Sequence, residues 1–420
     1  MLNPLSVLVL GAGDRGSKLI SRAKNQLVPT AVADPNKHKR VKYAKEHNIN
    51  SAFSYTWGKL ALDLAPPVDF VYIATPDETH HRLATLALKK GYNVLLEKPI
   101  ATTEQDCRDI IEAQEKSGKA LSVCHVLRYA PFFMKIQEVT ESGELGELQG
   151  IDLTEQVGYW HYAHSYVRGN WRRQEDSSPI ILAKSCHDMD ILTWLADSNP
   201  RTLFSRGSLD FFTGKNAPKG ATKKCTDGCP VEGCIYDARD FYVGEQVFED
   251  RDGKRHEKVV WPYNVFSDNP NQGQRLEELA QSSYGNCVFQ SDNNVCDNQD
   301  VVVEFDNDVT ANFRLRYHGE VPNRLISVNF SRGNISGSFI DNQMTVTRYG
   351  KKTQSKKETI SLAKQEGHGG GDAGLVRNFV ELIQSGNPNL NKTSAQRSLQ
   401  SHLMAFAAEK SRKTGNPIIF

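Results

Sequence analysis

A short apolar run followed by a glycine turn is the feature that most constrains the fold of this chain. Val7–Leu10 consists of β-type residues, and the sequence G-A-G-D-R-G at positions 11–16 follows it directly. An unbroken apolar run suits a parallel strand buried on both faces, so the order is strand, tight turn, helix. In such a turn Gly11 allows the bend, Gly13 lets the backbone approach a pyrophosphate, and Gly16 lets helix and strand pack closely. The turn therefore predicts a dinucleotide site, with the helix amides facing the anion.

A carboxylate at the end of the second predicted strand supports this interpretation. Asp34 follows the strand residues 30–33 and lies 23 positions after Gly11. At about that separation an acidic side chain can bind the adenosine ribose hydroxyls. Asp34 could instead cap the helix that begins at Pro35, and the two roles can coexist. A carboxylate favours NAD because it repels the extra phosphate of NADP, whereas the cations of residues 37–40 keep NADP possible.

Length and charge exclude several classes of protein. The 420 residues are enough for two domains with full cores, and the net charge of +1 gives no electrostatic reason to expect nucleic acid or an anionic membrane as a partner. The first apolar run is too short for a secretory signal, and no later run is long enough to span a bilayer. We therefore expect a cytoplasmic protein whose 8 cysteines are thiols or metal ligands.

Strand and helix patterns alternate regularly over residues 5–125. The predicted strands lie near residues 5–10, 29–33, 68–74, 92–96 and 120–125, and the predicted helices near 15–26, 36–47, 77–90 and 102–117. This βαβ order predicts a doubly wound parallel sheet in an N-terminal domain, residues 1–125. Functional residues are then expected just beyond the carboxyl ends of its strands.

Two of these strand ends carry chemically distinctive residues. Thr75, Pro76 and His80 follow one strand, and Glu97 and Lys98 follow the next, before a proline. A lysine held at a sheet edge between an acid and a proline is restrained and partly desolvated. Lys98 could orient a substrate hydroxyl or help its proton leave. The alternative is an ordinary surface pair of lysine and glutamate.

Four motifs, GAGDRG, VADPN, IATPDETH and EKP, resemble in order and spacing the Gfo/Idh/MocA family of NAD(P)-dependent oxidoreductases, which is named for glucose-fructose oxidoreductase and inositol dehydrogenase. The resemblance implies an α/β chain: a Rossmann domain over residues 1–125, then an α/β domain over residues 126–420 with a large, mostly antiparallel open sheet. It implies hydride transfer between a nicotinamide and a sugar or cyclitol carbon, with Lys98 in the active site. It also implies a homo-oligomer, a dimer or tetramer, formed through the second sheet.

The cofactor is expected to contact the glycine turn, the strand ends and the crossover between the domains. These residues are Gly11, Gly13, Arg15, Gly16, Asp34, Thr75, Pro76, His80, Glu97, Lys98 and Arg128. Arg128 is similar to an arginine that lies near the cofactor in the family, although it could be an exposed linker cation.

A segment rich in aromatic and basic residues, 158–173, favours a sugar site. Aromatic faces stack on the CH-rich faces of sugars, and polar side chains bind their hydroxyls. We expect Trp160, His161, His164 and Arg168 to contact the substrate. The alternative is a loop that covers its own core with its two tryptophans.

A predicted helix over residues 181–197 carries the candidate acid/base. Its pattern HxxDxxxWL, beginning at His187, resembles the family helix that bears the catalytic histidine. The family often has an aspartate four residues earlier, where this chain has Ala183, followed by Lys184. Lys184 and His187 are expected to share a helix face. We hypothesise that the cation of Lys184 keeps His187 neutral near pH 7 and able to accept a proton, and we count Lys184 among the catalytic residues.

Four cysteines predict a closed metal site in an insertion near residues 210–298. Cys225, Cys229 and Cys234 lie within ten residues, and Cys287 follows at a distance, with Cys296 as a fifth candidate. Such clustering is typical of a structural zinc site, with a catalytic ion as the alternative to a structural one. The spacing departs from the usual zinc knuckle, so an iron–sulfur cluster or unligated thiols remain alternatives.

The C-terminal part changes to alternating runs from Val301 onward, which predict antiparallel strands, and two closing helices are expected near residues 373–385 and 394–413. Asp297, just before the strands, is a candidate hydroxyl ligand, although turns also prefer such residues. His368 and Asp372 resemble late substrate-side residues of the family. A flexible glycine-rich turn is the alternative there.

These features favour an NAD-dependent dehydrogenase acting on a secondary hydroxyl of a sugar, glycoside or cyclitol. One alternative is a redox-neutral, NAD-dependent glycoside hydrolase or lyase that works through a transient keto-sugar. Another is a non-catalytic NAD-binding sensor.

Overall fold

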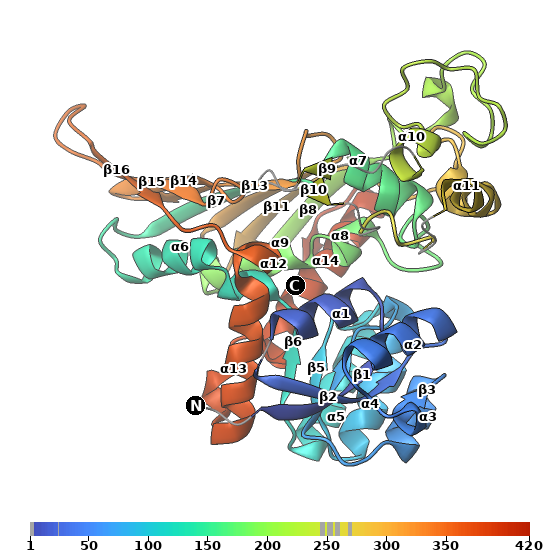
Figure 1. Ribbon diagram of the computed structural model, residues 1–420. Coiled ribbons are helices and arrows are strands. Elements are labelled where there is room, and N and C mark those ends of the chain that lie inside the picture. The colour runs from blue at the N-terminus through green and yellow to red at the C-terminus, as the bar shows by residue number, and fades with distance from the viewer. Residues whose placement is uncertain (1–3, 24, 244–247, 250–254, 257–260, 268–270) are drawn as a thin grey trace.

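The computed structural model describes residues 4–23, 25–243, 248–249, 255–256, 261–267 and 271–420. Two sheets organise it into two α/β halves, with helices between them (Figure 1). The predicted fold class, a doubly wound parallel sheet followed by a mostly antiparallel one, is confirmed.

The N-terminal sheet is parallel and, in the described residues, has the order β3-β2-β1-β4-β5-β6. Its strands are β1 (Leu5–Leu10), β2 (Leu27–Ala33), β3 (Ser54–Tyr55), β4 (Phe70–Ile73), β5 (Asn93–Leu96) and β6 (Leu121–Val123). Its helices are α1 (Asp14–Arg22), α2 (Lys37–Glu46), α3 (Gly58–Leu64), α4 (His80–Lys89) and α5 (Glu104–Ser117). The strand order reverses between β1 and β4, which is where a doubly wound sheet opens a crevice at its carboxyl ends.

A short strand and a helix between β2 and β4 are missing from the sequence prediction. β3 has only two residues, too few for an alternating pattern to be recognised. Helix α3 buries only Ala61 and Leu62, so its apolar face is also short.

The second sheet has the order β16-β15-β14-β13-β7-β12-β11-β8-β17 in the described residues. All neighbours are antiparallel except β7 and β12. The strands are β7 (Leu148–Gln156), β8 (Pro200–Ser208), β11 (Asn298–Phe305), β12 (Thr310–Arg316), β13 (Asn323–Phe330), β14 (Gly333–Ser338), β15 (Gln343–Arg348), β16 (Lys356–Ser361) and β17 (Ile418–Ile419). The prediction missed β8, β16 and β17; β16 is exposed along most of its length and gives no hydrophobic signal.

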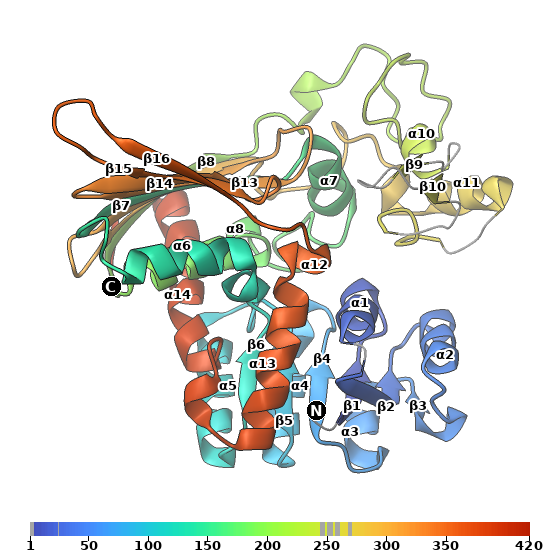
Figure 2. The same ribbon diagram turned by 60° about the vertical axis from the view of Figure 1, so that its left-hand side comes forward.

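Helices α6 (Pro131–Glu141), α8 (Ile180–Ala183), α9 (Cys186–Ala196) and α14 (Ala395–Thr414) cover the sheet face that looks toward the N-terminal half (Figures 1 and 2). The opposite face carries exposed apolar side chains, including Phe204, Val302 and Leu325. Among the described helices, none is long and apolar enough to cross a membrane.

The chain returns to the N-terminal half through α12 (Glu366–Gly369) and α13 (Gly371–Ser385). The Phe379 ring of α13 packs edge-on against Phe70 of β4, with ring centroids 5.1 Å apart. Val376 and Val380 join the same buried cluster as Val7. Part of the N-terminal core is therefore supplied from beyond residue 125.

The insertion between β8 and β11 extends past the end of the second sheet (Figure 1). Its described part includes α10 (Ala238–Tyr242), α11 (Gln272–Gln281) and the paired strands β9 (Phe248–Glu249) and β10 (Arg255–His256). Residues 244–247, 250–254, 257–260 and 268–270 of the predicted insertion lie outside the described residues.

Candidate active site

The glycine turn between β1 and α1 has a geometry that suits a bound anion. Gly11 has a φ of +96°, and a Cβ atom there would lie 2.3 Å from the carbonyl oxygen of Ala74. A Cβ at Gly16 would lie 1.9 Å from the carbonyl oxygen of Gly11, whereas one at Gly13 would meet no described atom within 4 Å. Two glycines therefore close the turn, and Gly13 faces open space beside the amides that begin α1. The pyrophosphate of a dinucleotide fits this cradle.

Asp34 directly follows β2, and its carboxylate is buried. One oxygen accepts a hydrogen bond from the N–H of Ala12 and the other from the N–H of Asn36, both at 2.8 Å. The N-cap of α2 is Asn36 rather than Asp34. The carboxylate expected beside a ribose is thus held next to the glycine turn by backbone donors.

His80 joins the two distinctive strand ends. Its Nδ1 lies 2.7 Å from the carbonyl oxygen of Pro99, and its Nε2 lies 3.0 Å from that of Thr75. The ring is fully buried. His80 therefore positions the two segments that follow β4 and β5, rather than presenting a ring nitrogen to a cofactor.

A buried charge cluster ties the start of α1 to α13. Arg15 Nε donates to Glu97 Oε1 at 2.8 Å, and the Tyr72 hydroxyl donates to the same oxygen at 2.8 Å. Arg15 also contacts Asp372 at 3.2 Å, and His368 Nδ1 lies 3.1 Å from that carboxylate. Burial raises the pKa of Glu97, but the charge of Arg15, the hydrogen bond from Tyr72 and the charge of Lys98 together outweigh it, and the pKa lies below its usual value. Arg15, Glu97 and Asp372 are therefore brought together as ion pairs, and His368, whose pKa burial lowers, lies beside them.

Lys98 reaches from the end of β5 to the second domain. Its Nζ donates a hydrogen bond to the carbonyl oxygen of Ala183 at 2.6 Å. After burial, its charge is the next cause that lowers the pKa of His187, which lies four residues after Ala183. Lys98 thus contacts the segment that carries the candidate acid/base.

His187, the predicted acid/base, lies in the first turn of α9. Its ring centroid is 5.6 Å from that of His125 and 6.2 Å from that of His368. Among the described residues its buried Nδ1 has no hydrogen-bond partner. Burial, and then the charge of Lys98, holds the pKa of His187 well below its usual value. The ring is therefore neutral at pH 7 and can accept a proton.

The predicted continuous helix over residues 181–197 is wrong. It is broken into α8, which ends at Ala183, and α9, which begins at Cys186. Ser185, between them, has a φ of −97° and a ψ of 8°, outside helical geometry. Lys184 is thus on neither helix, and it does not share a helix face with His187.

Lys184 pairs with the second sheet instead. Its Nζ lies 3.4 Å from Glu155 Oε1 of β7, and the other Glu155 oxygen lies 2.6 Å from Arg324. The charge of Lys184 lowers the pKa of His161, after the larger effect of burial. The pKa of His187 is lowered by burial and by the charge of Lys98, rather than by Lys184 as expected from the sequence.

The aromatic segment is helical rather than a loop: α7 (Tyr159–Tyr162) continues into a π-helix, Ala163–Arg168. The ring of His161 stacks on that of Trp160, with centroids 5.5 Å apart, and meets Trp261 of the insertion edge-on at 5.2 Å. Burial and Lys184 hold the pKa of His161 well below its usual value, and within the described structure its buried Nδ1 lacks a partner.

Trp171 connects this segment to the N-terminal half. Its indole Nε1 donates to Asp77 Oδ2 at 3.2 Å, directly after β4. Burial raises the pKa of Asp77, against the opposing charges of His80 and Lys98. The segment therefore lies beside the strand ends that the sequence marks, as a sugar site there requires.

Three predicted substrate contacts are corrected by the structure. His164 Nδ1 lies 2.7 Å from the Tyr242 hydroxyl, and its ring is buried under the insertion. Arg168, 2% exposed, donates to the carbonyl oxygens of Asn286 and Tyr236 at 2.7 and 2.6 Å. Both side chains therefore bind residues of the insertion rather than a substrate hydroxyl.

Asp297 is the third correction. It is fully buried, and its Oδ2 accepts hydrogen bonds from three consecutive backbone N–H groups, residues 210–212. Its role is to fix the turn that leaves β8.

Arg128 is buried and paired rather than an exposed linker cation. It donates to both oxygens of Asp190 at 2.7 and 2.8 Å and lies over the Trp194 ring. This bidentate pair joins the domain crossover to α9 and leaves the guanidinium little freedom to meet a cofactor.

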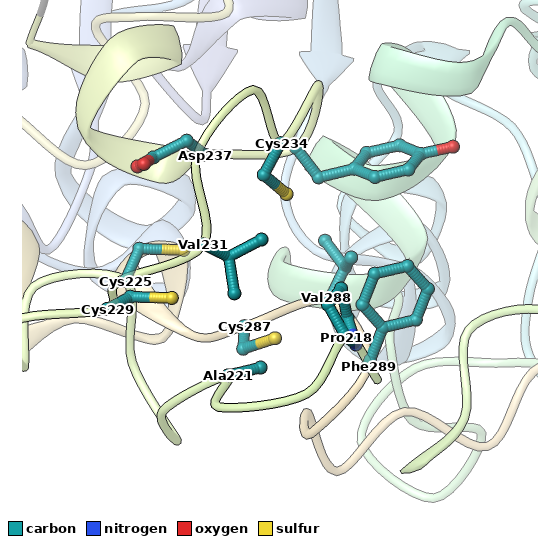
Figure 3. A pocket seen from close by; sticks show the side chains of 11 residues that line it. Pro218, Ala221, Cys225, Cys229, Val231, Cys234, Asp237, Cys287, Val288 and Phe289 are labelled. Carbon is teal, nitrogen blue, oxygen red and sulfur yellow. The ribbon is translucent and has the colours of Figure 1, made fainter. Parts of the chain in front are cut away.

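The four predicted metal ligands, Cys225, Cys229, Cys234 and Cys287, line one small pocket in the insertion (Figure 3). Among the described residues, no three of their sulfur atoms lie within 4.8 Å of one another. The cysteines are therefore gathered around one pocket, with their sulfur atoms farther apart than the ligands of a bound ion.

Sequence reasoning assigned no role to Asp77, Glu155, Arg324 or Trp261. Glu155 and Arg324 lie on strands and point toward the helices, where an alternating pattern predicts apolar residues. A charge at an inward strand position was the available signal. Trp261 gave none, because it lies in an irregular part of the insertion.

Residues 5–125 match the sequence profile GFO_IDH_MocA, described as an oxidoreductase family with an NAD-binding Rossmann fold. The YteT protein of Bacillus subtilis (strain 168) is 25% identical over 325 residues, which cover 74% of this chain and 72% of YteT. An inositol 2-dehydrogenase of Corynebacterium glutamicum is 29% identical over 205 residues, 47% of this chain and 56% of that protein. Residues 5–125 belong to the Gfo/Idh/MocA oxidoreductase family.

Solved oxidoreductase structures share the fold of the whole chain. A levoglucosan dehydrogenase in complex with NADH and levoglucosan has a TM-score of 0.72 at 15% identity and covers 99% of both chains. An oxidoreductase from Agrobacterium radiobacter in complex with NAD+, L-tartaric acid and magnesium has a TM-score of 0.68 at 16% identity, covering 99% of this chain and 98% of that one.

An aspartate is expected from the sequence resemblance where this chain has Ala183. Lys98 still has a hydrogen-bond acceptor there, because the backbone carbonyl of Ala183 takes that role. Lys98 is therefore oriented by a backbone carbonyl at that position.

Proposed function

We propose that this chain is an NAD-dependent dehydrogenase that acts on a secondary hydroxyl of a sugar, glycoside or cyclitol. The observation that carries the proposal is that Lys98, from the end of β5, donates a hydrogen bond to the carbonyl of Ala183, four residues before the buried His187 at the start of α9. A cation near an unprotonated imidazole is what removal of a hydroxyl proton requires. The glycine cradle follows β1 of the same sheet, with β4 between β1 and β5.

In this reaction the nicotinamide, when bound, takes a hydride from the carbon that carries the hydroxyl. The ammonium of Lys98 donates a hydrogen bond to the hydroxyl oxygen and stabilises negative charge as it develops there. His187 accepts the hydroxyl proton. Lys184, held by Glu155, acts as a positioning residue that keeps His161 neutral.

The walls of the site support a polyol substrate. Trp160 and Trp261 offer aromatic faces, and His161 has a buried ring nitrogen without a partner in the described structure. Such surfaces suit CH faces and hydroxyls respectively.

Asp34 supports NAD rather than NADP. Its carboxylate lies beside the cradle, and the Arg40 side chain donates to the Asp34 carbonyl. In that arrangement a ribose phosphate would meet a negative charge, with the nearby arginine already engaged.

A second candidate function is redox-neutral cleavage of a glycoside through a transient keto-sugar. His161 favours it, because a second neutral imidazole beside Lys98 and Lys184 could remove the proton next to a ketone. This reaction needs two bases, whereas the dehydrogenase needs one.

We also propose a homo-oligomer formed through the open face of the second sheet. Phe204, Val302 and Leu325 on that face are 36%, 48% and 41% exposed. A metal ion at the cysteine pocket is assigned to the fold rather than to this reaction, since the pocket belongs to the insertion.

A screen of sugars and cyclitols with NAD, followed at 340 nm, tests the function. Net NADH formation on one class of polyol, lost in Lys98→Met, is expected. Sugar release without NADH supports the redox-neutral reaction instead. Cofactor binding with no turnover of any polyol or glycoside contradicts both.

A further inference from the structure

The cysteine pocket is built by two stretches of the insertion that lie far apart in sequence. The N–H of Cys225 donates to the carbonyl of Gly285 at 2.9 Å, and the N–H of Cys287 donates to the carbonyl of Lys223 at 3.0 Å. This small antiparallel bridge places Cys225 and Cys287 next to each other. It leaves a cavity of about 20 Å³, which is room for one ion or one water molecule.

Cys229 and Cys234 reach the same cavity from glycine turns. Gly228 and Gly233, each one residue earlier, have φ values of +73° and +65°, and both face open space. Figure 3 shows the four thiols around the side chain of Val231. Half of the eight cysteines of the chain thus line a single pocket, from positions spread over 63 residues.

A cation lies beside the pocket. Arg168 Nη2 lies 3.7 Å from Cys225 Sγ. Arg239 donates to the carbonyl of Cys229 at 3.3 Å, and its guanidinium is paired with Asp237. The Arg168 guanidinium therefore offsets part of the negative charge of a thiolate cluster.

Part of the insertion has only a small core of its own. Among the described residues this separate buried apolar cluster has five members, Cys225, Ala238, Tyr242, Leu279 and Tyr284, whereas Tyr236 and Phe289 pack into the main core of the second domain. A core this small contributes only a few kcal/mol, so small units commonly rely on a disulfide or metal staple.

From these features the geometry points to one zinc ion bound by Cys225, Cys229, Cys234 and Cys287, as a closed structural site. Zinc–sulfur bonds of about 2.3 Å place tetrahedral sulfurs about 3.8 Å apart, so binding draws the sulfurs inward and displaces Val231. The glycine turns that carry Cys229 and Cys234 permit this movement. Each thiol loses its proton to solvent as its sulfur binds, and no electrons are transferred.

This site also restrains the aromatic segment. Arg168 ends the π-helix that follows His161, and it contacts Cys225 Sγ together with the carbonyls of Asn286 and Tyr236. Zinc binding fixes the three groups that Arg168 holds. The ion is thus placed to stabilise one wall of the proposed active site without touching substrate.

The experiment measures metal and thiols in the full-length protein. We expect one zinc per chain by elemental mass spectrometry, and four additional reactive thiols after a chelator removes it. Cys229→Ser and Cys287→Ser are expected to lower zinc occupancy at least tenfold, whereas Cys107→Ala, a buried cysteine in α5, leaves it unchanged.

Four results would overturn the zinc site. The first is zinc-free protein that does not take up added zinc when all thiols are reduced, and the second is full zinc occupancy in both pocket variants. The third is iron with sulfide in place of zinc. The fourth is a mass lower by about two hydrogens, which shows a disulfide within the cluster of the native protein. NADH binding by each variant reports whether the N-terminal domain is folded, so a folding failure is not mistaken for loss of a ligand. These readouts do not depend on catalytic activity.

Discussion

Replacing Gly13 by alanine separates cofactor binding from folding. Gly13 has φ −76° and ψ −167°, which alanine adopts freely, and a Cβ there meets no described atom within 4 Å. The substitution stabilises the protein by about 0.4–1 kcal/mol through the unfolded state and destabilises it by about 0.5–1 kcal/mol because alanine is a poorer N-cap than glycine. The two effects nearly cancel, so the free energy of unfolding should change by about 0.5 kcal/mol or less. The new methyl group, however, occupies the space where a pyrophosphate meets the backbone. We expect NADH affinity to fall at least tenfold, about 1.4 kcal/mol.

Gly16→Ala, in contrast, should lower the free energy of unfolding. Its Cβ would lie 1.9 Å from the Gly11 carbonyl oxygen, so α1 must shift, at a cost of about 1–3 kcal/mol. Gly118→Ala, at a φ of +63° after α5, controls for backbone strain alone and should cost about 1–2 kcal/mol with NADH binding intact. Titration calorimetry and urea unfolding measure both quantities. A Gly13→Ala protein that binds NADH as tightly as the wild type would refute the assignment of the cradle.

Three further predictions concern charge. Lys98→Met should lower kcat by about 10²–10⁴ with NADH binding retained, and wild-type turnover would contradict its role. Burial lowers the pKa values of His187 and His161 in the folded protein, so below about pH 6.5 these histidines bind protons in the unfolded chain but not in the folded one. The free energy of unfolding should therefore fall as the pH drops. The slope of this fall should be shallower in His187→Gln. Equal slopes in urea unfolding would show that His187 is protonated in the fold. Asp190→Asn leaves Arg128 buried beside a neutral amide and should destabilise the protein by about 3–5 kcal/mol, seen as a lower urea midpoint; a loss below 1 kcal/mol would mean that the pair is not buried in solution.

The N-terminal fold could be predicted because its signals are local. The apolar runs of β1, β4 and β5 and the glycine turn each fit within a few residues of sequence. β3 and β16 escaped prediction because one is two residues long and the other is charged and exposed.

The sequence could predict a site residue only where a local motif or a strand end fixes its place. Lys98 and His187 lie where motif and strand end place them. Arg168 looks like a ligand for hydroxyls, but its partners are backbone carbonyls some 70 to 120 residues later, which no sequence pattern reveals. The apolar pattern over residues 181–197 is regular, and it therefore predicts Lys184 on the helix face of His187. In the structure a helix break interrupts this pattern, and Lys184 pairs with Glu155 of the second sheet.

The packing of α13 against β4 bears on how the protein is made. A chain synthesised from its N-terminus exposes Val7 and Phe70 on one face of the first sheet until Phe379 and Val380 have left the ribosome. Roughly three hundred residues separate the two partners. The nucleotide-binding half therefore completes its hydrophobic core only after Val380 has been synthesised, and a nascent chain released before that point presents an uncovered apolar sheet face to chaperones and proteases.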